Sequence, residues 1–362
     1  MKITNSVISI ILCLAVTPAE LLAHAYECDK VLFASRKPVL WKNTPITFRV
    51  ENSIWNDPTR KAALDEAVEY WNKAAENSFV INIFQENGSS MQANNNVNEI
   101  YMAPPSEFDP GVLATAPIRW SDPNEISGHC YMKEADIKFN TDFIWDNVPE
   151  WGDFSGPVNF GLVAVHEIGH TLAQKHLNTH LATMNESYPA GGQIGSNYES
   201  RPHAPELALH RSLYGIGSQT VDVAASAWTI VPPPGQTFTG SAYTLDLIRD
   251  DYSTLTNGSV SRGENVFFRY SIENLGTTTK DLEVKMYMSN DSIIGDSGDI
   301  YLGMSYYTLP GGTNLTGEKY LQIPTTQTGF QYFGYKVTQA TGEPSSVLDN
   351  NWIRLYRTYW VN

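Results

Sequence analysis

The most informative stretch of the chain reads His166-Glu-Ile-Gly-His-Thr-Leu-Ala-Gln-Lys-His176. In an α-helix, His166 and His170 are four residues apart and lie on one face. Two imidazoles on one face can share one zinc ion. Glu167 lies one step round the helix, so its carboxylate can reach a water on the metal without ligating it. This is the physical content of the H-E-x-x-H motif, which predicts Glu167 as the general base.

The third histidine, His176, needs a different argument. It follows His170 by six residues, which is about 600° of helical rotation and brings it to another face of a continued helix. It can join the metal only if the helix ends soon after Leu172 and the chain turns back. Three histidines and one water would then make a tetrahedral catalytic site with an open position. A purely structural zinc ion would need a fourth protein ligand, which this spacing does not offer.

Strand-like and helix-like patterns surround the motif. Residues 45–50 and 79–84 predict strands because they are rich in β-branched and aromatic types. Asp57-Pro58 predicts the start of a helix, and residues 158–172 predict the helix that carries the motif. The apolar residues of the first helix recur at helical spacing and are expected in the core: Leu64, Ala67, Val68, Trp71 and Ala75. Residues 113–120 and 135–139 are further strand candidates.

The residue pattern changes after Val231-Pro-Pro-Pro-Gly235, a stretch that interrupts regular secondary structure. Beyond it, strand-like runs are separated by Gly, Asn and Pro turns, and no helical period survives. This spacing predicts a β-sandwich. We therefore expect four parts: a signal peptide (1–25), a first domain (26–226), a linker (227–240) and a β-sandwich (241–362).

The first 25 residues have the layout of a secretory signal peptide. Lys2 gives a positive start, Val7–Val16 is an apolar run, and Ala23-His24-Ala25 offers a cleavage site. The alternative, a membrane anchor, would need about 20 apolar residues. We therefore expect Tyr26 to begin the mature chain, secretion to the exterior or the periplasm, and no membrane span.

Cleavage after Ala25 would leave two cysteines, Cys28 and Cys130. Two cysteines in an exported chain predict one disulfide, which would close a loop of about 100 residues. Two other interpretations stay open. Both thiols could be buried and unpaired, or Cys28 could be an inhibitory thiolate on the zinc.

The composition limits the classes of partner. The chain has 362 residues, 42% hydrophobic and 17% charged, with a net charge of −15. These values suit a folded protein and argue against a nucleic-acid partner, which would require a basic patch. Calcium is a possible second metal, at Asp291, Asp296 and Asp299, although their spacing does not fit an EF-hand and a turn is the simpler interpretation. Four other histidines lack ligand spacing and are expected at the surface or in caps: His129, His180, His203 and His210.

The stretch from His166 to His176 resembles the long zinc motif of the metzincin metalloproteases. Downstream, Leu181-Ala-Thr-Met-Asn-Glu-Ser-Tyr188 resembles their Met-turn in the matrixin style. The resemblance implies that Met184 lies beneath the zinc and that Tyr188 shapes the specificity pocket. It covers roughly residues 38–216 and implies an α+β catalytic domain with a twisted, mostly parallel sheet, an antiparallel edge strand and a cleft across the front.

Two strands and a helix carry further likeness. Gly111-Val-Leu-Ala-Thr-Ala116 is similar to the matrixin edge strand, which implies that Leu113, Ala114, Thr115 and Ala116 pair with substrate. Glu134–Asn140 resembles the strand that follows, and Pro205–Gly215 resembles the closing helix. Two departures stand out. Ala173 replaces the family's glycine at a left-handed turn, and the second, structural zinc site lacks its histidines, near Thr115 and Ile137.

The C-terminal segment resembles immunoglobulin-like, adhesion-related (CARDB-like) modules of bacterial exported proteins, through residues 263–276, 287–291 and 349–351. A bacterial source also fits the Asn-x-Ser sequon at Asn185, because a glycan there would crowd the cleft.

These features together predict a zinc endopeptidase that acts on polypeptides with one catalytic zinc ion, and a C-terminal domain that targets a cell surface or glycan. The alternative is an adhesion or binding protein on an inactive protease scaffold, which would be expected to lack Glu167 or a ligand. None is missing.

Overall fold

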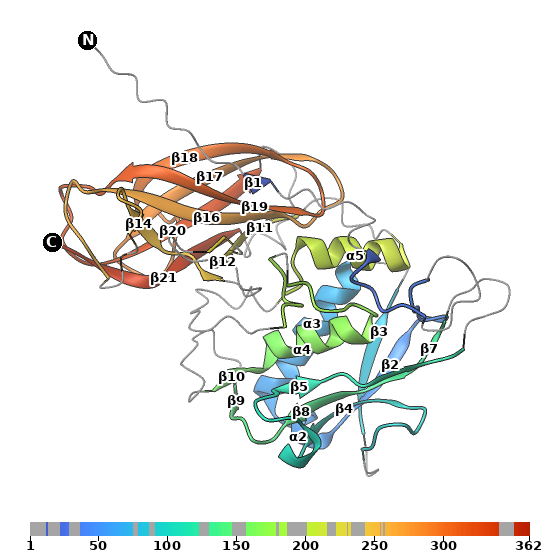
Figure 1. Ribbon diagram of the computed structural model, residues 1–362. Helices are drawn as coiled ribbons and strands as arrows, with labels where there is room; N and C mark the ends of the chain where they lie inside the picture. The colour runs from blue at the N-terminus through green and yellow to red at the C-terminus, as the bar shows by residue number, and fades with distance from the viewer. Residues whose placement is uncertain are drawn as a thin grey trace. The chain divides into compact units, whose positions relative to one another are not determined.

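The protein is described from a computed structural model (Figure 1). The structure describes residues 12–13, 22–28, 37–74, 79–86, 91–122, 130–146, 157–178, 181–186, 201–215, 222–229, 231–232, 243–253, 255, 258–339 and 351–362. The chain divides into two compact units. The first unit comprises Val16–Glu186 and Ser200–Thr220, and the second comprises Met1–Ala15, Ser187–Glu199 and Val221–Asn362.

A five-stranded sheet forms the frame of the first unit, in the order β3-β2-β4-β8-β5. Its strands are β2 (Ile46–Val50), β3 (Ile81–Gln85), β4 (Asn98–Ala103), β5 (Ala114–Thr115) and β8 (Ile137–Asn140). The first four in this order are parallel to one another, and β5 is antiparallel to β8 at the edge. The expected mostly parallel sheet with an antiparallel edge strand is therefore confirmed.

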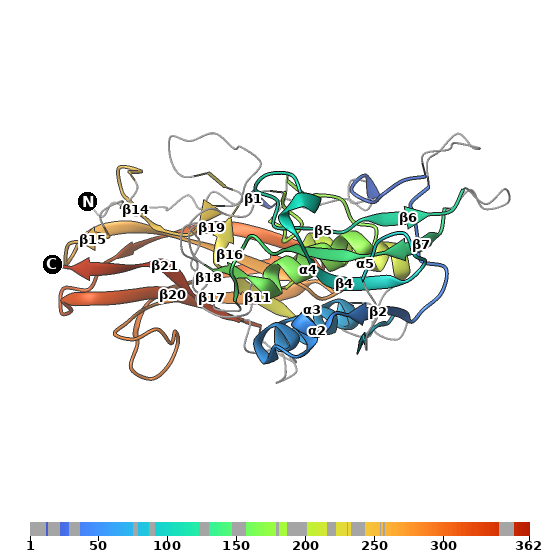
Figure 2. The same ribbon diagram turned by 90° about the horizontal axis from the view of Figure 1, so that it is seen from below.

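Two long helices pack against each other beside this sheet (Figures 1 and 2). They are α3 (Pro58–Ala74) and α4 (Phe160–Thr171). The expected apolar stripe of α3 is buried at Leu64, Ala67, Val68 and Trp71. The Trp71 indole N–H donates to the carbonyl of Val165 at 3.1 Å, which fixes α3 against the middle of α4.

Shorter elements complete the first unit. They are α2 (Asn52–Trp55), the 3-10 turn η1 (Pro105–Glu107), β6 (Ile118–Trp120), β7 (Met132–Ala135), β9 (Trp145–Asp146), β10 (Val158–Asn159) and α5 (Ala204–Tyr214). The expected strand 113–120 is two strands, β5 and β6, and the latter pairs with β7 rather than with the main sheet. The carbonyl of Pro117, between β5 and β6, accepts the N–H of Asp136, between β7 and β8.

Cys28 and Cys130 form a disulfide, as predicted. Both are buried, and they pack with Val39, Met132 and Ala173. The disulfide therefore ties the N-terminal segment and β7 to Ala173, two residues after the end of α4. The interpretation of Cys28 as a zinc-bound thiolate is wrong, because its sulfur is in this bond.

The second unit is a β-sandwich, as expected. One sheet has the order β1-β19-β16-β11, with β14 also paired to β16, and the other has the order β15-β21-β20-β17-β18. The strands are β1 (Leu12–Cys13), β11 (Val223–Ser226), β14 (Leu247–Arg249), β15 (Ser259–Val260), β16 (Asn265–Asn274), β17 (Lys280–Ser289), β18 (Ile300–Leu309), β19 (Thr313–Gln322), β20 (Gly329–Gln339) and β21 (Trp352–Val361). A separate pair joins β12 (Trp228–Thr229) to β13 (Tyr243–Thr244).

Alternating side chains fill the interior of this sandwich. In β17, every second residue from Leu282 to Met288 is buried, which is the period of a strand with one face in a core. The hydroxyl of Tyr335 on β20 crosses to the other sheet, where it accepts the N–H groups of Ser226 and Ser271 at 3.2 and 3.0 Å. This polar contact joins the two layers.

The expected boundary at residue 226 differs from the division in the structure. Residues 223–226 form β11, whose four residues pair with β16 inside the second unit. The division falls between Thr220 and Val221. Three small apolar residues and a serine, with no turn signal after them, do not stand out in the sequence from the end of a helical domain.

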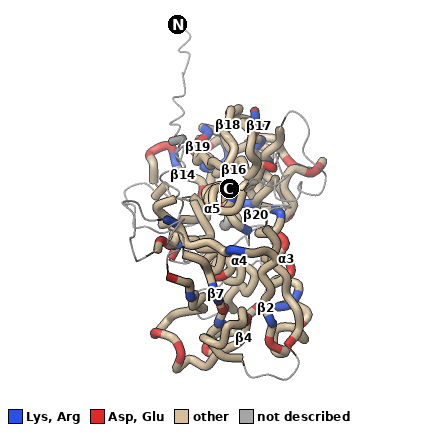
Figure 3. The backbone as a smooth tube through the Cα atoms, turned by 90° about the vertical axis from the view of Figure 1, so that its right-hand side faces the viewer, with Lys and Arg blue, Asp and Glu red and all other residues tan. Residues whose placement is uncertain are grey.

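Two further observations bear on the partner classes. Lys and Arg are interspersed with Asp and Glu along the backbone (Figure 3). Within the described residues, no helix is long and apolar enough to cross a membrane.

Candidate metal centre

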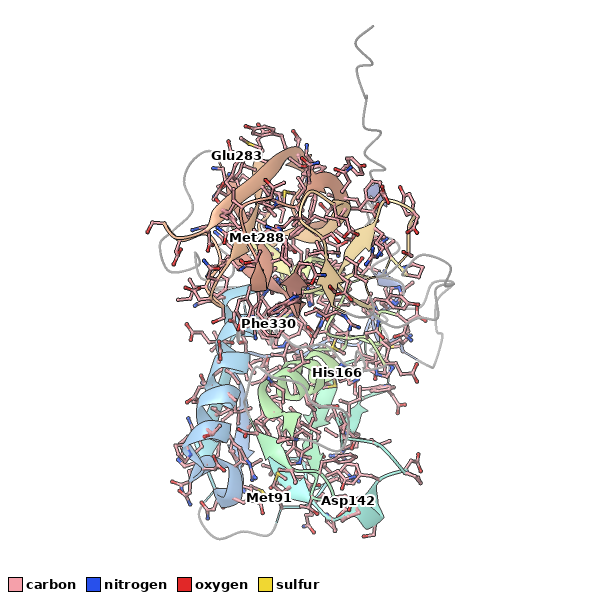
Figure 4. All side chains as sticks on the ribbon, turned by 90° about the vertical axis from the view of Figure 1, so that its left-hand side faces the viewer. Met91, Asp142, His166, Glu283, Met288 and Phe330 are labelled. Atoms are coloured by element: carbon pink, nitrogen blue, oxygen red, sulfur yellow. A yellow bond between two sulfur atoms is a disulfide. The ribbon has the colours of Figure 1, made fainter. Side chains whose placement is uncertain are left out.

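Helix α4 positions the first two histidines. It starts where the Asn159 side chain accepts the N–H of Leu162 at 2.9 Å, a side-chain cap that fixes the first turn. The rings of His166 and His170 then lie on one face, with centroids 4.7 Å apart. His166 is labelled on this helix in Figure 4.

The chain reverses directly after α4 and brings the third histidine back. Leu172 caps the helix, and Ala173 has a left-handed φ of 67°. The N–H of Gln174 donates to the carbonyl of Gly169 at 3.1 Å, which closes the turn as in a helix that ends in a left-handed residue. The His176 ring lies 5.3 Å from that of His166 and 4.9 Å from that of His170, measured between centroids.

The three histidines form the one group among the described residues with metal-ligand geometry. One ligand atom from each of His166, His170 and His176 lies within 4.8 Å of the others. This is close enough for one ion at bonds of about 2.0–2.1 Å to each nitrogen. Asp291, Asp296 and Asp299 do not form such a group, and each accepts a nearby backbone N–H in a turn, from Ile293, Gly298 and Gly295.

Backbone carbonyls orient two of the rings. Nδ1 of His166 lies 2.7 Å from the carbonyl of Thr183, and Nδ1 of His170 lies 2.8 Å from the carbonyl of Gln174. A carbonyl can only accept, so Nδ1 carries the proton in both rings and Nε2 is left as the metal-binding atom. The expected spacing on one helix face thus comes with the tautomer that a zinc ligand needs.

Burial keeps these imidazoles neutral. It lowers the pKa of His166 to about 4 and that of His170 well below its usual range. The pKa of His176 is lowered for the same reason, with the charge of Glu186 opposing the effect. A neutral imidazole is the form that binds a metal.

Glu167 is buried beside the histidines, with 5% of its surface exposed. Its Oε2 atom has no hydrogen-bond partner in the described part of the chain. Burial raises the pKa of its carboxyl to about 8. A buried carboxylate oxygen without a partner is costly, and such groups gather where chemistry requires them.

The turn around Met184 lies against α4. The Met184 side chain is fully buried with Leu177 and Ala182. Its carbonyl accepts the N–H of Leu177, next to His176, at 2.8 Å. Its own N–H donates to a carboxylate oxygen of Glu206 on α5. Tyr188, the other pocket residue implied by the resemblance, lies outside the described residues.

Two comparisons with known proteins bear on this unit. Residues 40–198 match the family model of the matrixins. This part of the chain is matrixin-like. The matrixin-like segment contains the histidine triad, Glu167 and the edge strand β5, and the site fits a zinc metalloprotease. None of the curated proteins matches the chain.

Solved structures offer only weak likenesses. The CARDB domain of a Pyrococcus furiosus protein, in complex with di-metal ions, is 16% identical over 29% of this chain and 80% of that one, with a TM-score of 0.19. The C-terminal domain of Wzt is 8% identical over 38% and 75%, with a TM-score of 0.23. A Niemann-Pick type C2 protein from the Japanese carpenter ant is 6% identical over 40% and 96%, with a TM-score of 0.21. At these scores they carry no argument, so the sandwich is described from its own strands.

The sequence did not reveal three supports of the matrixin-like site. They are the carbonyls of Thr183 and Gln174, and the carboxylate of Glu206. Carbonyls exist at every residue and leave no signal in a sequence. Glu206 follows Pro205 in the expected closing helix and carries a signal only as an acidic residue in a first turn.

Proposed function

We propose that this protein is a secreted zinc-dependent endopeptidase. The observation that carries the proposal is the convergence of His166, His170 and His176, with ligand atoms within 4.8 Å of one another, beside a buried Glu167. The matrixin-like character of residues 40–198 supports it.

The donor set fits zinc. Three neutral imidazoles suit this ion, and a fourth position is left for water or substrate. His166, His170 and His176 would hold it. When bound, zinc polarises the scissile carbonyl and lowers the pKa of a water to about 7.

Glu167 supplies the proton transfers. Its carboxylate takes the proton of the attacking water and then delivers it to the leaving amine. A carboxyl whose pKa lies near the working pH can do both; burial raises the pKa of Glu167, and the charge of a bound zinc ion would lower it. The buried surroundings also keep bulk water away from this proton.

The edge strand β5 gives a place for the substrate. Within the described residues, Ala114 and Thr115 pair on one side only, with Phe139 and Lys138 of β8. The carbonyl of Leu113 also faces this side, where it accepts the N–H of Asn140 at 2.9 Å. The other side of residues 113–116 can bind an extended polypeptide by strand addition.

Export and targeting belong to the same proposal. Residues 1–25 would direct secretion, and the C-terminal sandwich would hold the enzyme at a cell surface or glycan. The buried disulfide supports an oxidising compartment. Sequencing the N-terminus of the exported protein tests this part, and a chain that keeps Met1–Ala25 after export would contradict it.

The decisive experiment replaces Glu167 by Gln in zinc-loaded protein. Zinc content and thermal stability should stay at the wild-type level, because Glu167 is not a ligand. Cleavage of a peptide library should fall by a factor of roughly 10² or more. Wild-type protein that binds zinc and cleaves no peptide would instead favour the alternative, a binding protein on an inactive scaffold.

A further inference from the structure

One peptide group links a buried carboxylate to a zinc-ligand candidate. The carbonyl oxygen of Thr183 accepts Nδ1–H of His166 at 2.7 Å. The N–H of Met184 donates to Oε1 of Glu206. This carbonyl and this N–H belong to the same planar, conjugated peptide unit, so charge at one end polarises the other.

The hydrogen bonds around Glu206 favour its ionised form. Its side chain is fully buried on α5, and its second oxygen, Oε2, accepts the N–H of His203. With an N–H donor at each oxygen, a carboxylic-acid proton would meet a donor rather than an acceptor. Burial raises the pKa of Glu206 to about 7, while the charge of His203 and the backbone donors, including Thr183, oppose that rise.

His170 provides an internal contrast. Its Nδ1–H donates to the carbonyl of Gln174 at 2.8 Å, in the same manner as His166. The N–H of the same peptide unit, which belongs to Lys175, donates to the carbonyl of His24 at 2.6 Å, an acceptor that the proposed cleavage after Ala25 would remove. That acceptor is neutral. Two ligand candidates on one helix thus donate to the carbonyls of two peptide groups. Only one of these peptide groups donates its N–H to a carboxylate.

We propose that Glu206 is a positioning residue that strengthens the hold of His166 on zinc through the Thr183–Met184 peptide. A carboxylate that accepts the peptide N–H makes the Thr183 carbonyl a stronger acceptor. A stronger acceptor at Nδ1–H fixes the ring and makes Nε2 more basic toward the metal. The inference rests on the proposed function in one respect, namely that the triad binds zinc.

The expected change in zinc affinity is small because Glu206 acts on His166 indirectly. Loss of a partner that contacts a ligand histidine directly costs about 10–100-fold in metal affinity. Glu206 acts across one peptide, so the lower end, about tenfold, is expected. The same carboxylate also holds the N-terminus of α5 and the Met184 turn, so its loss costs stability as well, and the test must separate the two.

Glu134 offers a matched control in the same unit. It too is a buried carboxylate that accepts two backbone N–H groups, from Asn95 and Asn96 at 2.9 and 3.0 Å. It also pairs with Arg119. None of these partners is a ligand candidate. Glu134→Gln therefore reports what the loss of a buried, backbone-bound charge does to the fold alone.

The experiment measures zinc affinity in the full chain by competition with a chelator, together with the Hδ1 resonances of 15N-labelled histidines. For Glu206→Gln, we expect the dissociation constant for zinc to rise about tenfold and the Hδ1 signal of His166 to move upfield, while that of His170 stays. Glu134→Gln should change neither. A dissociation constant within about twofold of wild type, or an equal loss in Glu134→Gln, overturns the proposal.

Glu206→Asp decides the matter if Glu206→Gln does not fold. Asp keeps the charge but is one methylene short, so the signal of His166 should move and that of His170 should not. Equal movement of both signals overturns the proposal. No readout involves a substrate, so a chain that binds zinc in this way and cleaves nothing would refute the proposed function and leave this inference standing.

Discussion

A β-carbon added at Gly169 would lie 2.3 Å from the Sδ atom of Met184. The same atom would also lie 3.2 Å from the Trp71 ring. Gly169 directly precedes His170, the second ligand candidate, and Met184 follows the carbonyl that orients His166, the first. The turn of Met184 therefore packs directly on the backbone of α4, at a position where only glycine leaves room.

Gly169→Ala should therefore destabilise the first unit, although alanine is the better helix former by about 1 kcal/mol. A methyl group that meets a buried sulfur and an indole ring costs about 1–3 kcal/mol in overpacking. We expect a net loss of up to about 2 kcal/mol in the free energy of unfolding, together with weaker zinc binding as the Met184 turn shifts. Denaturant titration and chelator competition measure the two effects.

A double-mutant cycle with Met184→Ala checks the cause. Met184→Ala alone should cost about 2–5 kcal/mol through the cavity that it leaves. In that background, Gly169→Ala should cost much less than alone, because the new methyl group fills part of the space. Additive losses would show that Gly169 is required for a reason other than its contact with Met184.

The sequence predicted those parts of the site that depend on a short-range period. His166, Glu167 and His170 follow from the helical repeat, and the structure places both histidines on one face. The spacing shows that His176 can reach the other two histidines only if the chain reverses after the helix. It does not show whether the chain makes that reversal. The resemblance flagged Ala173 as a misfit, and the structure keeps the left-handed turn with alanine, at φ 67°.

Buried packing explains how alanine is accommodated there. The Ala173 side chain is fully buried against the disulfide cluster. A left-handed alanine costs about 1–2 kcal/mol, and a buried methyl group returns about 0.8 kcal/mol. The sequence could not show this offset, because it depends on Cys28 and Cys130, which are remote in the chain. The place of β11 in the sandwich is not evident from the sequence for the same reason, since the residues with which it pairs on β16 lie 45 to 51 positions further on.

His210 makes the stability of the first unit sensitive to acid. It was expected at the surface or in a cap, but the structure buries it completely among the rings of Trp71, Phe79 and Tyr214. Neither ring nitrogen has a hydrogen-bond partner among the described residues. Burial, helped by the charge of Arg211, lowers its pKa to about 3.

The direction in which pH changes the stability follows from the number of protons that the folded and unfolded chains bind. Below about pH 6.5 the unfolded chain binds a proton at this residue, and the folded chain does not until about pH 3. Stability is therefore lost as pH falls through this window, by up to about 1.4 kcal/mol per pH unit. His210→Phe should reduce this slope, because the lowered pKa values of His166 and His170 contribute in the same direction, and it should be no less stable at pH 7. An unchanged slope in the free energy of unfolding between pH 6 and 4.5 would assign the acid sensitivity to other groups.

The disulfide should contribute both stability and metal retention. Its cysteines are 102 residues apart, and a loop of that size corresponds to about 4–5 kcal/mol on the chain-entropy model. It also packs on Ala173, where the chain turns toward His176. Replacing both cysteines by Ser should lower the midpoint of thermal unfolding and speed the loss of zinc to a chelator. A variant that melts lower but releases zinc at the wild-type rate would limit the disulfide to a global role.

The last prediction concerns the division of labour between the two units. The three ligand candidates, Glu167 and β5 all lie in the first unit, and the C-terminal segment of the second unit begins with Val221. Each unit has its own buried core and its own sheets, and units of this kind usually fold independently. A chain that ends at Thr220 should therefore be soluble and cleave small peptides at close to the full-length rate.

The truncated chain and the full chain should differ in their activity on large or surface-bound substrates. Only such substrates gain from a second binding site, because that site raises the local concentration of the enzyme. The loss should appear in KM rather than in kcat, since the sandwich would bind without touching the reacting atoms. If the chain that ends at Thr220 fails to fold, or loses small-peptide cleavage by about tenfold or more, the sandwich is part of the catalytic unit. Its strands would then have to be counted among the supports of the zinc site.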